Sequence, residues 1–288
     1  LEMSNLQQVA RNERIQLAPM IEEIFTDLAP LAEKRGVTLD AEGDVALTIG
    51  SSGRICYIGS EPIYDKRLLN CRSPYQGLYT ILQTTDNAGI SLRWFRDVFG
   101  DAVQQKAEAA GLSIYDYMNT LAEKVPAGCN GLVYLPYLAG EKSPIWDSDA
   151  RGVFFGMSLS TDYGAFVRAI MEGVALSMRD CMEIMPAAKK SISPIPLGGG
   201  AANSRVWCQI FADVLNRPIV RLKSGETETL GDFIIAAESV GLSDVARDFG
   251  KKLAAESEVL YPDSAAASVY DKAYQKYKAV YQNTKTLF

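Results

Sequence analysis

The sequence contains no histidine among its 288 residues. Without an imidazole, the chain cannot build a Ser-His-Asp or Cys-His nucleophilic site, a histidine metal site or a phosphohistidine relay. Any catalysis by these residues must therefore use carboxylates, hydroxyls, lysine, cysteine or backbone dipoles. This absence excludes mechanisms but assigns none.

The chain also lacks long apolar runs and an excess of positive charge. No run reaches the ~18 residues of a membrane-spanning helix, and the mean hydropathy is -0.02. The formal net charge is -6 and the pI is about 5.0, whereas a nucleic-acid-binding surface needs clustered basic residues. We therefore expect no membrane span and no nucleic-acid partner.

Paired cysteines are missing as well. The five cysteines stand far apart without a CxxC pair, and the opening LEMSNLQQVA is not a secretory signal. This usage favours reduced thiols in a cytoplasmic protein. Free cysteines are most often small buried residues, and we expect that core role for Cys56, Cys71, Cys129, Cys181 and Cys208.

The residues that are present divide the chain into two parts. Residues 1–43 carry apolar side chains at helical spacing from Leu17 to Leu31, which predicts an amphipathic helix that bends or ends at Pro30. No chemistry is visible in this lead. From Val45 the pattern changes to strands and turns, so we place the second part at residues 44–288.

The second part begins with a cluster of strands and then alternates strands with helices. Strands are predicted as a hairpin over 45–59, at 69–73 and 77–83, and in GLVYLPYL, ISPIPL and PIVRL. Helices are predicted from Asp86 or Asn87, after GGGAANS, from Thr227, and at 102–110, 114–124, 162–185 and 265–281. This order is typical of an α/β domain with a mixed sheet flanked by helices.

The first candidate site is the predicted hairpin turn, which contains Gly50, Ser51, Ser52 and Gly53. Glycine lets the backbone approach a ligand closely, and successive amides and hydroxyls in such a turn can cradle phosphate oxygens. The alternative is an ordinary hairpin turn, since glycine and serine dominate turns in general. The residues alone leave both interpretations open.

The second candidate site is the segment LGGGAAN, which lies between a predicted strand and a predicted helix. Three glycines cost conformational entropy unless the backbone must pack tightly or meet a ligand, and the following helix N-terminus favours negative charge. Asn203 replaces the third glycine of a GxGxxG fingerprint, and the chain has no Walker A sequence. A purely structural strand–helix turn is an equal alternative.

Two further segments carry charge without a clear role. The loop 140–156 can bind a polar ligand or can be a charged surface loop pinned by aromatics, and the second interpretation is favoured. Its charged residues are Glu141, Lys142, Asp147, Asp149 and Arg151. In the segment 226–232, the threonines and glutamates are expected to cap a helix.

Six blocks, taken in order, resemble the FGGY family of carbohydrate kinases. The blocks are ALTIGSSG, DNAGISLRWFRD, EKVPAGCNGLVYLPYLAGEKSPIWDSDARGVFFGMSLS, VRAIMEGVALSMRD, PLGGGAANSRVWCQIFADVLNRPI and ETETLG. Their order and spacing are much more specific than any glycine turn alone. Within the family, the pattern is most similar to gluconate kinases and xylulokinases.

The resemblance implies an actin-like ATPase fold with a ribonuclease H-like core, in which residues 44–288 correspond to the C-terminal, nucleotide-binding domain. It also implies phosphorylation of a sugar or sugar acid with ATP and Mg²⁺. In the family, the first turn contacts the ATP phosphates and the second lies against adenosine. The implied nucleotide-binding residues are Gly50, Ser51, Ser52, Gly53, Gly198, Gly199, Gly200, Ala201 and Asn203. The loop 140–156 resembles a family signature that shapes the domain near the cleft.

The chain departs from the family where the catalytic base is expected. That base is an Asp in a Gly/Ser-Asp segment shortly before the hairpin, and it takes a proton from the attacking sugar hydroxyl. Asp40 and Asp44 lack that context, so the catalytic residue stays unassigned. The sugar pocket of the family's N-terminal domain is missing too, so we expect this chain to be inactive alone. Smaller departures are Ala165 and Asp232.

Residues 1–43 lie outside the resemblance. They are weakly similar to the segment of sensor histidine kinases that joins the dimerisation helices to the ATP-binding domain, but none of that family's nucleotide boxes follow. The alternative function is therefore a non-catalytic nucleotide-binding or assembly module that uses the N-terminal helix for partner contact, including a homodimer. A chaperone-type actin-like ATPase is a third reading, which the blocks around LRWFRD and YLAGEKSPIWD disfavour.

Overall fold

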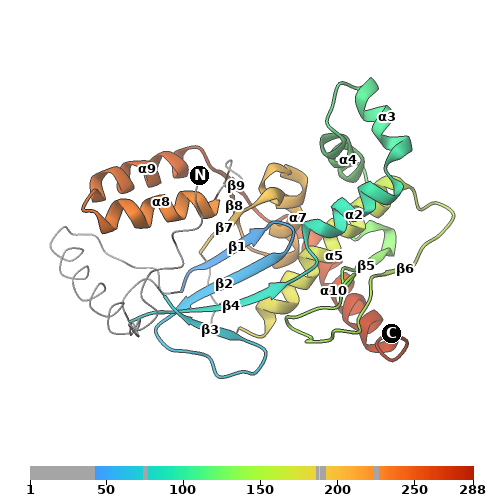
Figure 1. Cartoon of the computed structure of the whole chain (residues 1–288). Helices are drawn as coiled ribbons and strands as arrows, with labels where there is room; N and C mark the ends of the chain where they lie inside the picture. The colour runs from blue at the N-terminus through green and yellow to red at the C-terminus, as the bar shows by residue number, and fades with distance from the viewer. Residues whose placement is uncertain (1–42, 74–76, 186–187, 189–192, 223–226) are drawn as a thin grey trace, which may run out of the picture.

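A mixed sheet forms the centre of the structure (Figure 1). The computed structural model describes residues 43–288 except 74–76, 186–187, 189–192 and 223–226. Seven strands pair in the order β3-β4-β2-β1-β7-β8-β9, and β5 pairs with β6 apart from them. The strands span Val45–Ile49 (β1), Gly53–Gly59 (β2), Leu69–Arg72 (β3), Tyr79–Thr85 (β4), Val133–Leu135 (β5), Val153–Phe155 (β6), Ile195–Gly198 (β7), Ile219–Arg221 (β8) and Glu258–Leu260 (β9).

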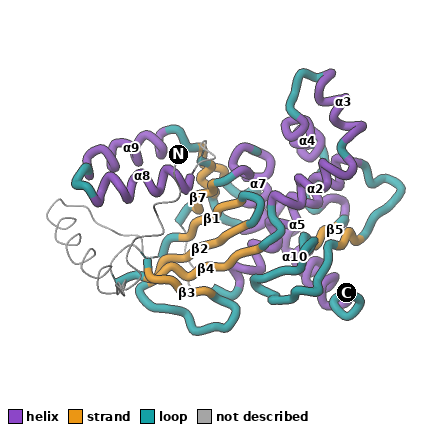
Figure 2. Tube along the Cα trace, in the orientation of Figure 1, coloured by secondary structure: helices purple, strands orange, loops and turns teal. Residues whose placement is uncertain are grey.

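Helices surround this sheet (Figures 1 and 2). The long helix α5 packs against β2, β4, β5 and α7. Helices α8 and α9 pack on each other and lie apart from α5 in Figure 1. The helices span Gly89–Phe99 (α2), Asp101–Ala109 (α3), Ile114–Glu123 (α4), Tyr163–Glu183 (α5), Arg205–Leu215 (α7), Thr227–Ser239 (α8), Ser243–Ala255 (α9) and Ser264–Thr284 (α10). Two short 3-10 turns are Cys129–Gly131 (η2) and Gly200–Asn203 (η3).

The centre of the sheet is set by β1. Its alternating pattern buries Val45, Leu47 and Ile49 on the core face, as expected for a strand with one covered side. It pairs antiparallel with β2, and the register from Val45↔Tyr57 to Ile49↔Gly53 leaves a three-residue turn. It pairs parallel with β7 through Leu47↔Leu197 and Thr48↔Gly198. The turns that follow β1 and β7 therefore leave the sheet at the same edge.

A buried ionic network fixes α10 against α5. The Arg168 guanidinium donates to Glu172 at 2.7 Å and to the Tyr270 hydroxyl at 3.0 Å, and that hydroxyl donates to Glu172 at 2.9 Å. The Gly128 amide donates to the same carboxylate at 3.1 Å. Each of these polar groups has a partner, so the C-terminal helix is held by matched charges as well as by apolar packing.

Most predicted elements are confirmed, with shifted boundaries at several ends. The helix expected from Asp86 or Asn87 begins at Gly89, because the Asn87 side chain instead binds the Gly140 carbonyl at 2.6 Å. The sequence prediction missed β6, α9 and β9. The two strands have three residues each, too few for a readable period, and β6 lies inside the predicted loop 140–156.

The five cysteines are free thiols, but not all belong to the core. Cys129, Cys181 and Cys208 are buried as expected, and Cys56 is half-buried. Cys71 is exposed, so its predicted core role is wrong; it lies on β3, an edge strand whose residues are all exposed. Among the described residues, no helix is both long and apolar enough to cross a membrane.

Candidate functional site

The two glycine turns predicted from the sequence come together at one cavity of about 440 Å³. This volume lies within the ~300–1,000 Å³ typical of small-molecule sites. Gly50 and Ser51 of the first turn line it, and Gly200, Ala201 and Asn203 of the second turn line it from the other side. Their meeting follows from the parallel pairing of β1 with β7, since both turns begin where these neighbouring strands end.

In the first turn, amides at the start of α2 occupy the backbone carbonyls, while the amides and hydroxyls of the two serines stay exposed. The Gly50 carbonyl accepts from the Gly89 amide at 2.9 Å, and the Ser51 carbonyl accepts from the Ala88 and Ile90 amides at 3.1 Å. Ser51 and Ser52 are exposed, and their amides and hydroxyls have no partner within the described part of the chain. The turn therefore presents unpaired hydrogen-bond donors, which suit an anion.

Two other predicted residues of this region are placed differently. Ser52 and Gly53 do not line the cavity. Gly53 is the buried first residue of β2, and a Cβ there would lie 2.8 Å from the Thr85 Cγ2 atom and 3.3 Å from the Ala88 Cβ. The lack of a side chain at Gly53 thus serves the packing of β2 on β4 and on the start of α2.

The second turn depends on glycine at one position in particular. Gly199 has φ +80° and ψ -174°, a conformation almost restricted to glycine, and a Cβ there would lie 2.7 Å from the Ile49 carbonyl oxygen. Gly199 and Gly198 shape the approach to β1 but do not line the cavity. Gly200 has no atom within 4 Å of its Cβ position, so its side facing the cavity is open.

The remaining walls come from α2, α4 and α7, and sequence reasoning assigned none of these residues to the site. Arg93 on α2 is exposed, and no ion-pair partner for it occurs in the described ranges. On α4, Asn119 accepts from the Ser204 hydroxyl at 2.8 Å, and this hydrogen bond ties α4 to the residue that follows the second turn. The other added lining residues are Gly89, Leu92, Ser113, Tyr115, Asp116, Ser204 and Trp207, and Ile49 at the end of β1, which belongs to the first candidate segment, lines the cavity as well. The available signal was the family resemblance: its block DNAGISLRWFRD carries Gly89, Leu92 and Arg93, and its block beginning PLGGGAANSRVW carries Ser204 and Trp207.

The cavity offers binding groups rather than a nucleophile or a metal cage. Its one carboxylate belongs to Asp116, which accepts from the Ser113 hydroxyl at 2.6 Å at the start of α4. The nearby Cys208 thiol is buried, and burial raises its pKa to about 12, so it stays protonated. The described residues contain no group of three or more Cys, Asp or Glu side chains that could hold a metal ion. The described residues therefore form no all-protein cage for a metal ion.

The loop 140–156 does not reach the cavity and instead supports its neighbours. Glu141 is buried, where it accepts from the Thr85 hydroxyl and from the Asp86 amide at 3.1 Å. Desolvation raises its pKa to about 7. Asp147 accepts from the Tyr281 hydroxyl at 2.7 Å, so an aromatic does pin the loop. The interpretation as a pinned loop fits, except that Glu141 is a core residue rather than a surface one.

Other candidate positions are placed as follows. Asp44 lies directly before β1, at the opposite end of that strand from the cavity, which agrees with leaving the catalytic role unassigned to it. Asp40, Glu226 and the helix expected in residues 1–43 lie outside the described residues. The predicted helix from Thr227 is present as α8.

Comparisons with known proteins give a consistent family. The profile of the "FGGY family of carbohydrate kinases, C-terminal domain" matches residues 45–240. A gluconokinase of Bacillus licheniformis is 35% identical over 217 residues, which cover 73% of this chain and 41% of that protein. A xylulose kinase of Staphylococcus epidermidis is 32% identical over 242 residues, which cover 83% of this chain and 47% of that protein. The chain thus spans less than half the length of these relatives.

A solved structure agrees with the sequence matches. The gluconate kinase of Lactobacillus acidophilus is similar with a TM-score of 0.71 at 28% identity, covering 84% of this chain and 48% of that chain. This likeness confirms the predicted fold class, an actin-like ATPase fold with a mixed sheet flanked by helices.

Proposed function

Because the chain belongs to the FGGY family of carbohydrate kinases, we propose that it is the C-terminal, nucleotide-binding half of an ATP-dependent kinase. The acceptor is a sugar or sugar acid of the gluconate or xylulose class, as named for the relatives. The observation that carries the proposal is the cavity in which the turns after β1 and β7 meet.

The groups around this cavity support nucleotide binding. The unpaired amide and hydroxyl of Ser51 suit phosphate oxygens, those of Ser52 lie beside the cavity on the same turn, and the Arg93 guanidinium adds a positive charge. Gly200 and Asn203 on the opposite turn leave an open side for the nucleoside. In phosphoryl transfer, such positioning and charge stabilisation supply most of the catalysis.

Mg²⁺ accompanies ATP in this proposal, but the described residues do not form a cage for it. Magnesium ions in kinase sites are held largely by substrate phosphates, waters and one or two carboxylates. Asp116 is engaged at the start of α4, and the described residues gather no acidic cluster. We therefore assign no residue to the metal.

Acceptor binding and proton removal belong to another part of the kinase in this proposal. The single carboxylate of the cavity is hydrogen-bonded to Ser113 and does not stand free as a base. The chain therefore binds ADP or ATP weakly and does not phosphorylate gluconate or xylulose by itself. The free thiols of all five cysteines suit the cytoplasmic location expected from the sequence.

Calorimetric titration of the 288-residue chain with ADP tests the proposal. We expect weak binding that Arg93→Ala reduces at least fivefold. The matched control is Arg151→Ala, since Arg151 is also exposed but donates to the Ser148 carbonyl outside the cavity. Absence of ADP binding, or equal loss in both variants, contradicts the assigned site.

Two further measurements separate the alternatives. Phosphorylation of gluconate or xylulose by this chain at ordinary kinase rates would show that it contains its own base. A chain that binds no nucleotide but forms a dimer lost on deletion of residues 1–43 would favour the assembly module instead. Sedimentation of the 288-residue chain and of the chain without residues 1–43, each with and without ADP, detects the dimer and its loss.

A further inference from the structure

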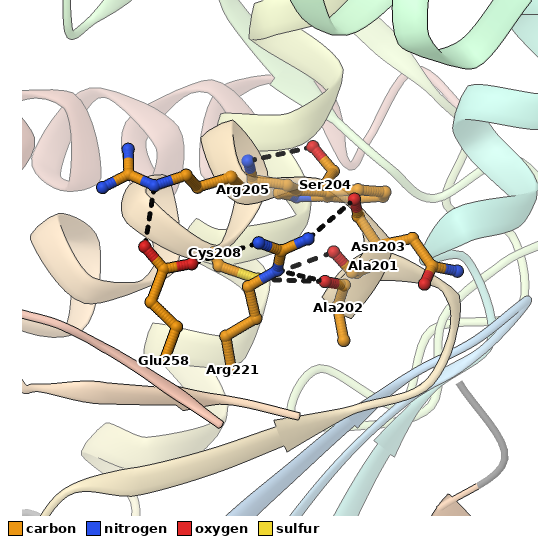
Figure 3. A network of polar contacts seen from close by, with 9 residues as sticks. Ala201, Ala202, Asn203, Ser204, Arg205, Cys208, Arg221 and Glu258 are labelled. Atoms are coloured by element: carbon orange, nitrogen blue, oxygen red, sulfur yellow. Dashed lines mark hydrogen bonds and ion pairs between the residues drawn. The ribbon is translucent and has the colours of Figure 1, made fainter. Parts of the chain in front are cut away.

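The second glycine turn is braced from behind by one arginine of β8 (Figure 3). The Arg221 Nε donates to the Ala202 carbonyl at 2.6 Å, and its Nη2 donates to the Asn203 carbonyl at 3.2 Å. Ala202 is fully buried, and in the described part of the chain its carbonyl has one other donor, the Cys208 thiol at 4.0 Å. Loss of Arg221 would leave this buried acceptor without a good donor.

The guanidinium is itself held by the neighbouring strand. Its Nη1 lies 3.1 Å from Glu258 Oε2, and Arg221 and Glu258 are direct partners in the antiparallel register of β8 and β9. The second oxygen of Glu258 accepts from Arg205 Nε at 2.9 Å. Hydrogen bonds from Arg205 and Arg221 hold the pKa of Glu258 below its usual range, so the carboxylate stays charged.

Arginine is the side chain that this geometry requires. Its three nitrogens meet three separate acceptors in different directions, which matches the rigid planar fork of a guanidinium. A lysine ammonium is a compact charge on a flexible stem and cannot reach both carbonyls and Glu258 in the same way. Figure 3 shows the Arg221 guanidinium between Glu258 on one side and the backbone carbonyls of Ala202 and Asn203 on the other.

We infer that Arg221 is a positioning residue for nucleotide binding, which fixes the turn Gly200–Asn203 and is kept in place by its cross-strand partner Glu258. The inference rests on the proposed function for its ligand, since this turn forms the wall opposite Ser51. The edge strand β9, which contributes no residue to the cavity lining, thereby takes part in shaping the site.

The first test needs no nucleotide. Amide hydrogen exchange of the 288-residue chain is compared with that of Arg221→Ala. We expect at least tenfold faster exchange at Ala202 and Ser204, whose amides donate to Gly199 and Ala201 within the turn, and unchanged exchange in the β1–β2 hairpin. Equal exchange in the turn overturns the inference, whether or not the chain binds ADP.

The second test compares ADP with inorganic tripolyphosphate. We expect Arg221→Ala to weaken ADP binding about tenfold while changing tripolyphosphate binding less than twofold, because the latter needs only the donors of the first turn. A merely destabilised chain would lose both ligands together. Equal losses, or no loss of ADP binding, overturn the inference.

Three more variants sharpen this test. Arg221→Lys should not restore ADP affinity, and Glu258→Gln should weaken it by a smaller factor, since the guanidinium then loses its charged partner. Arg205→Ala is the matched control: Arg205 also pairs with Glu258 but bonds to no carbonyl of the turn. Full rescue by lysine, or an Arg205→Ala loss as large as that of Arg221→Ala, contradicts the role assigned to Arg221. If the unmodified chain binds no ADP, the proposed function fails and the exchange test alone decides the inference.

Discussion

Two adjacent glycines of the second turn have different physical roles. Gly199 has a backbone conformation that other residues rarely adopt, and its α-carbon packs on the Ile49 backbone. Gly200 has open space around it and faces the cavity. The sequence shows both only as members of one GGG run, so it predicts their importance but not the division between structure and binding.

Gly199→Ala should therefore lower the free energy of unfolding by about 2–4 kcal/mol, through backbone strain and the clash with Ile49. Gly200→Ala, the matched control, should change it by less than about 0.5 kcal/mol. Urea unfolding of both variants measures this difference. Similar losses in the two variants would show that the close approach of Gly199 to β1 is not a constraint on stability.

At the scale of elements, α5 and α10 are linked by a buried polar network, in which Tyr270 of α10 bonds to Arg168 and Glu172 of α5, and by one exposed ion pair. Glu172 is 3% exposed and pairs with Arg168 inside the core. Asp271 of α10 pairs with Arg179 of α5 at 2.6 Å, but its side chain is 65% exposed. The two contacts thus allow a buried polar network and an exposed ion pair to be compared between the same two helices.

Glu172→Ala should cost about 3–5 kcal/mol of stability, because it leaves the buried Arg168 charge and the Gly128 amide without their acceptor. Asp271→Ala should cost less than about 1 kcal/mol, since water screens the exposed pair. Denaturant unfolding, with circular dichroism to confirm the native fold, checks both values. A cost below about 1 kcal/mol for Glu172→Ala would rule out the network as a major link between the helices.

The elements that the sequence predicted well are those with a readable period or a clear turn. The hairpin over 45–59 and the helix over 162–185 are close to the observed β1, β2 and α5. The short strand β9 was missed because its three residues gain their strand conformation from pairing with β8. Since Glu258 lies on that strand, the bracing of the second turn could not be predicted either.

At the scale of the whole molecule, stability should depend on pH near neutrality. Burial raises the pKa of Glu141 to about 7, well above its value in an unfolded chain, and raises those of Asp180 and Asp213. A raised pKa means that the folded state binds the proton more tightly. The stability that Glu141 contributes is therefore full below about pH 4.5 and is lost as the pH rises through about 7.

Glu141→Gln should flatten this dependence. The glutamine can still accept from the Asp86 and Lys142 amides and can donate to the Thr85 hydroxyl, but it does not titrate. Between pH 5 and 8 the unmodified chain should lose about 1–3 kcal/mol relative to the variant. The free energy of unfolding of both proteins is measured at several pH values across this range. If it changes equally with pH in the two proteins, Glu141 is not the titrating group.

The sequence predicted only part of the candidate site. The glycine turns carry a local signal, and the parallel pairing of β1 and β7 brings them together as the family resemblance implied. Arg93 and Asn119 sit on ordinary amphipathic helices, where an exposed polar residue has no distinguishing pattern. Their position in the cavity wall is a property of tertiary packing.

The pairing of β1 with β7 also sets when the cavity can exist. Thr48 of β1 and its partner Gly198 of β7 are about 150 positions apart in the sequence, whereas the β1–β2 hairpin closes within a few residues. Contacts of such long range form slowly, because the intervening chain loses much entropy on closure. A growing chain on the ribosome can therefore complete the hairpin early, but it gains the cavity of about 440 Å³ only after β7 and the turn beyond it have been synthesised.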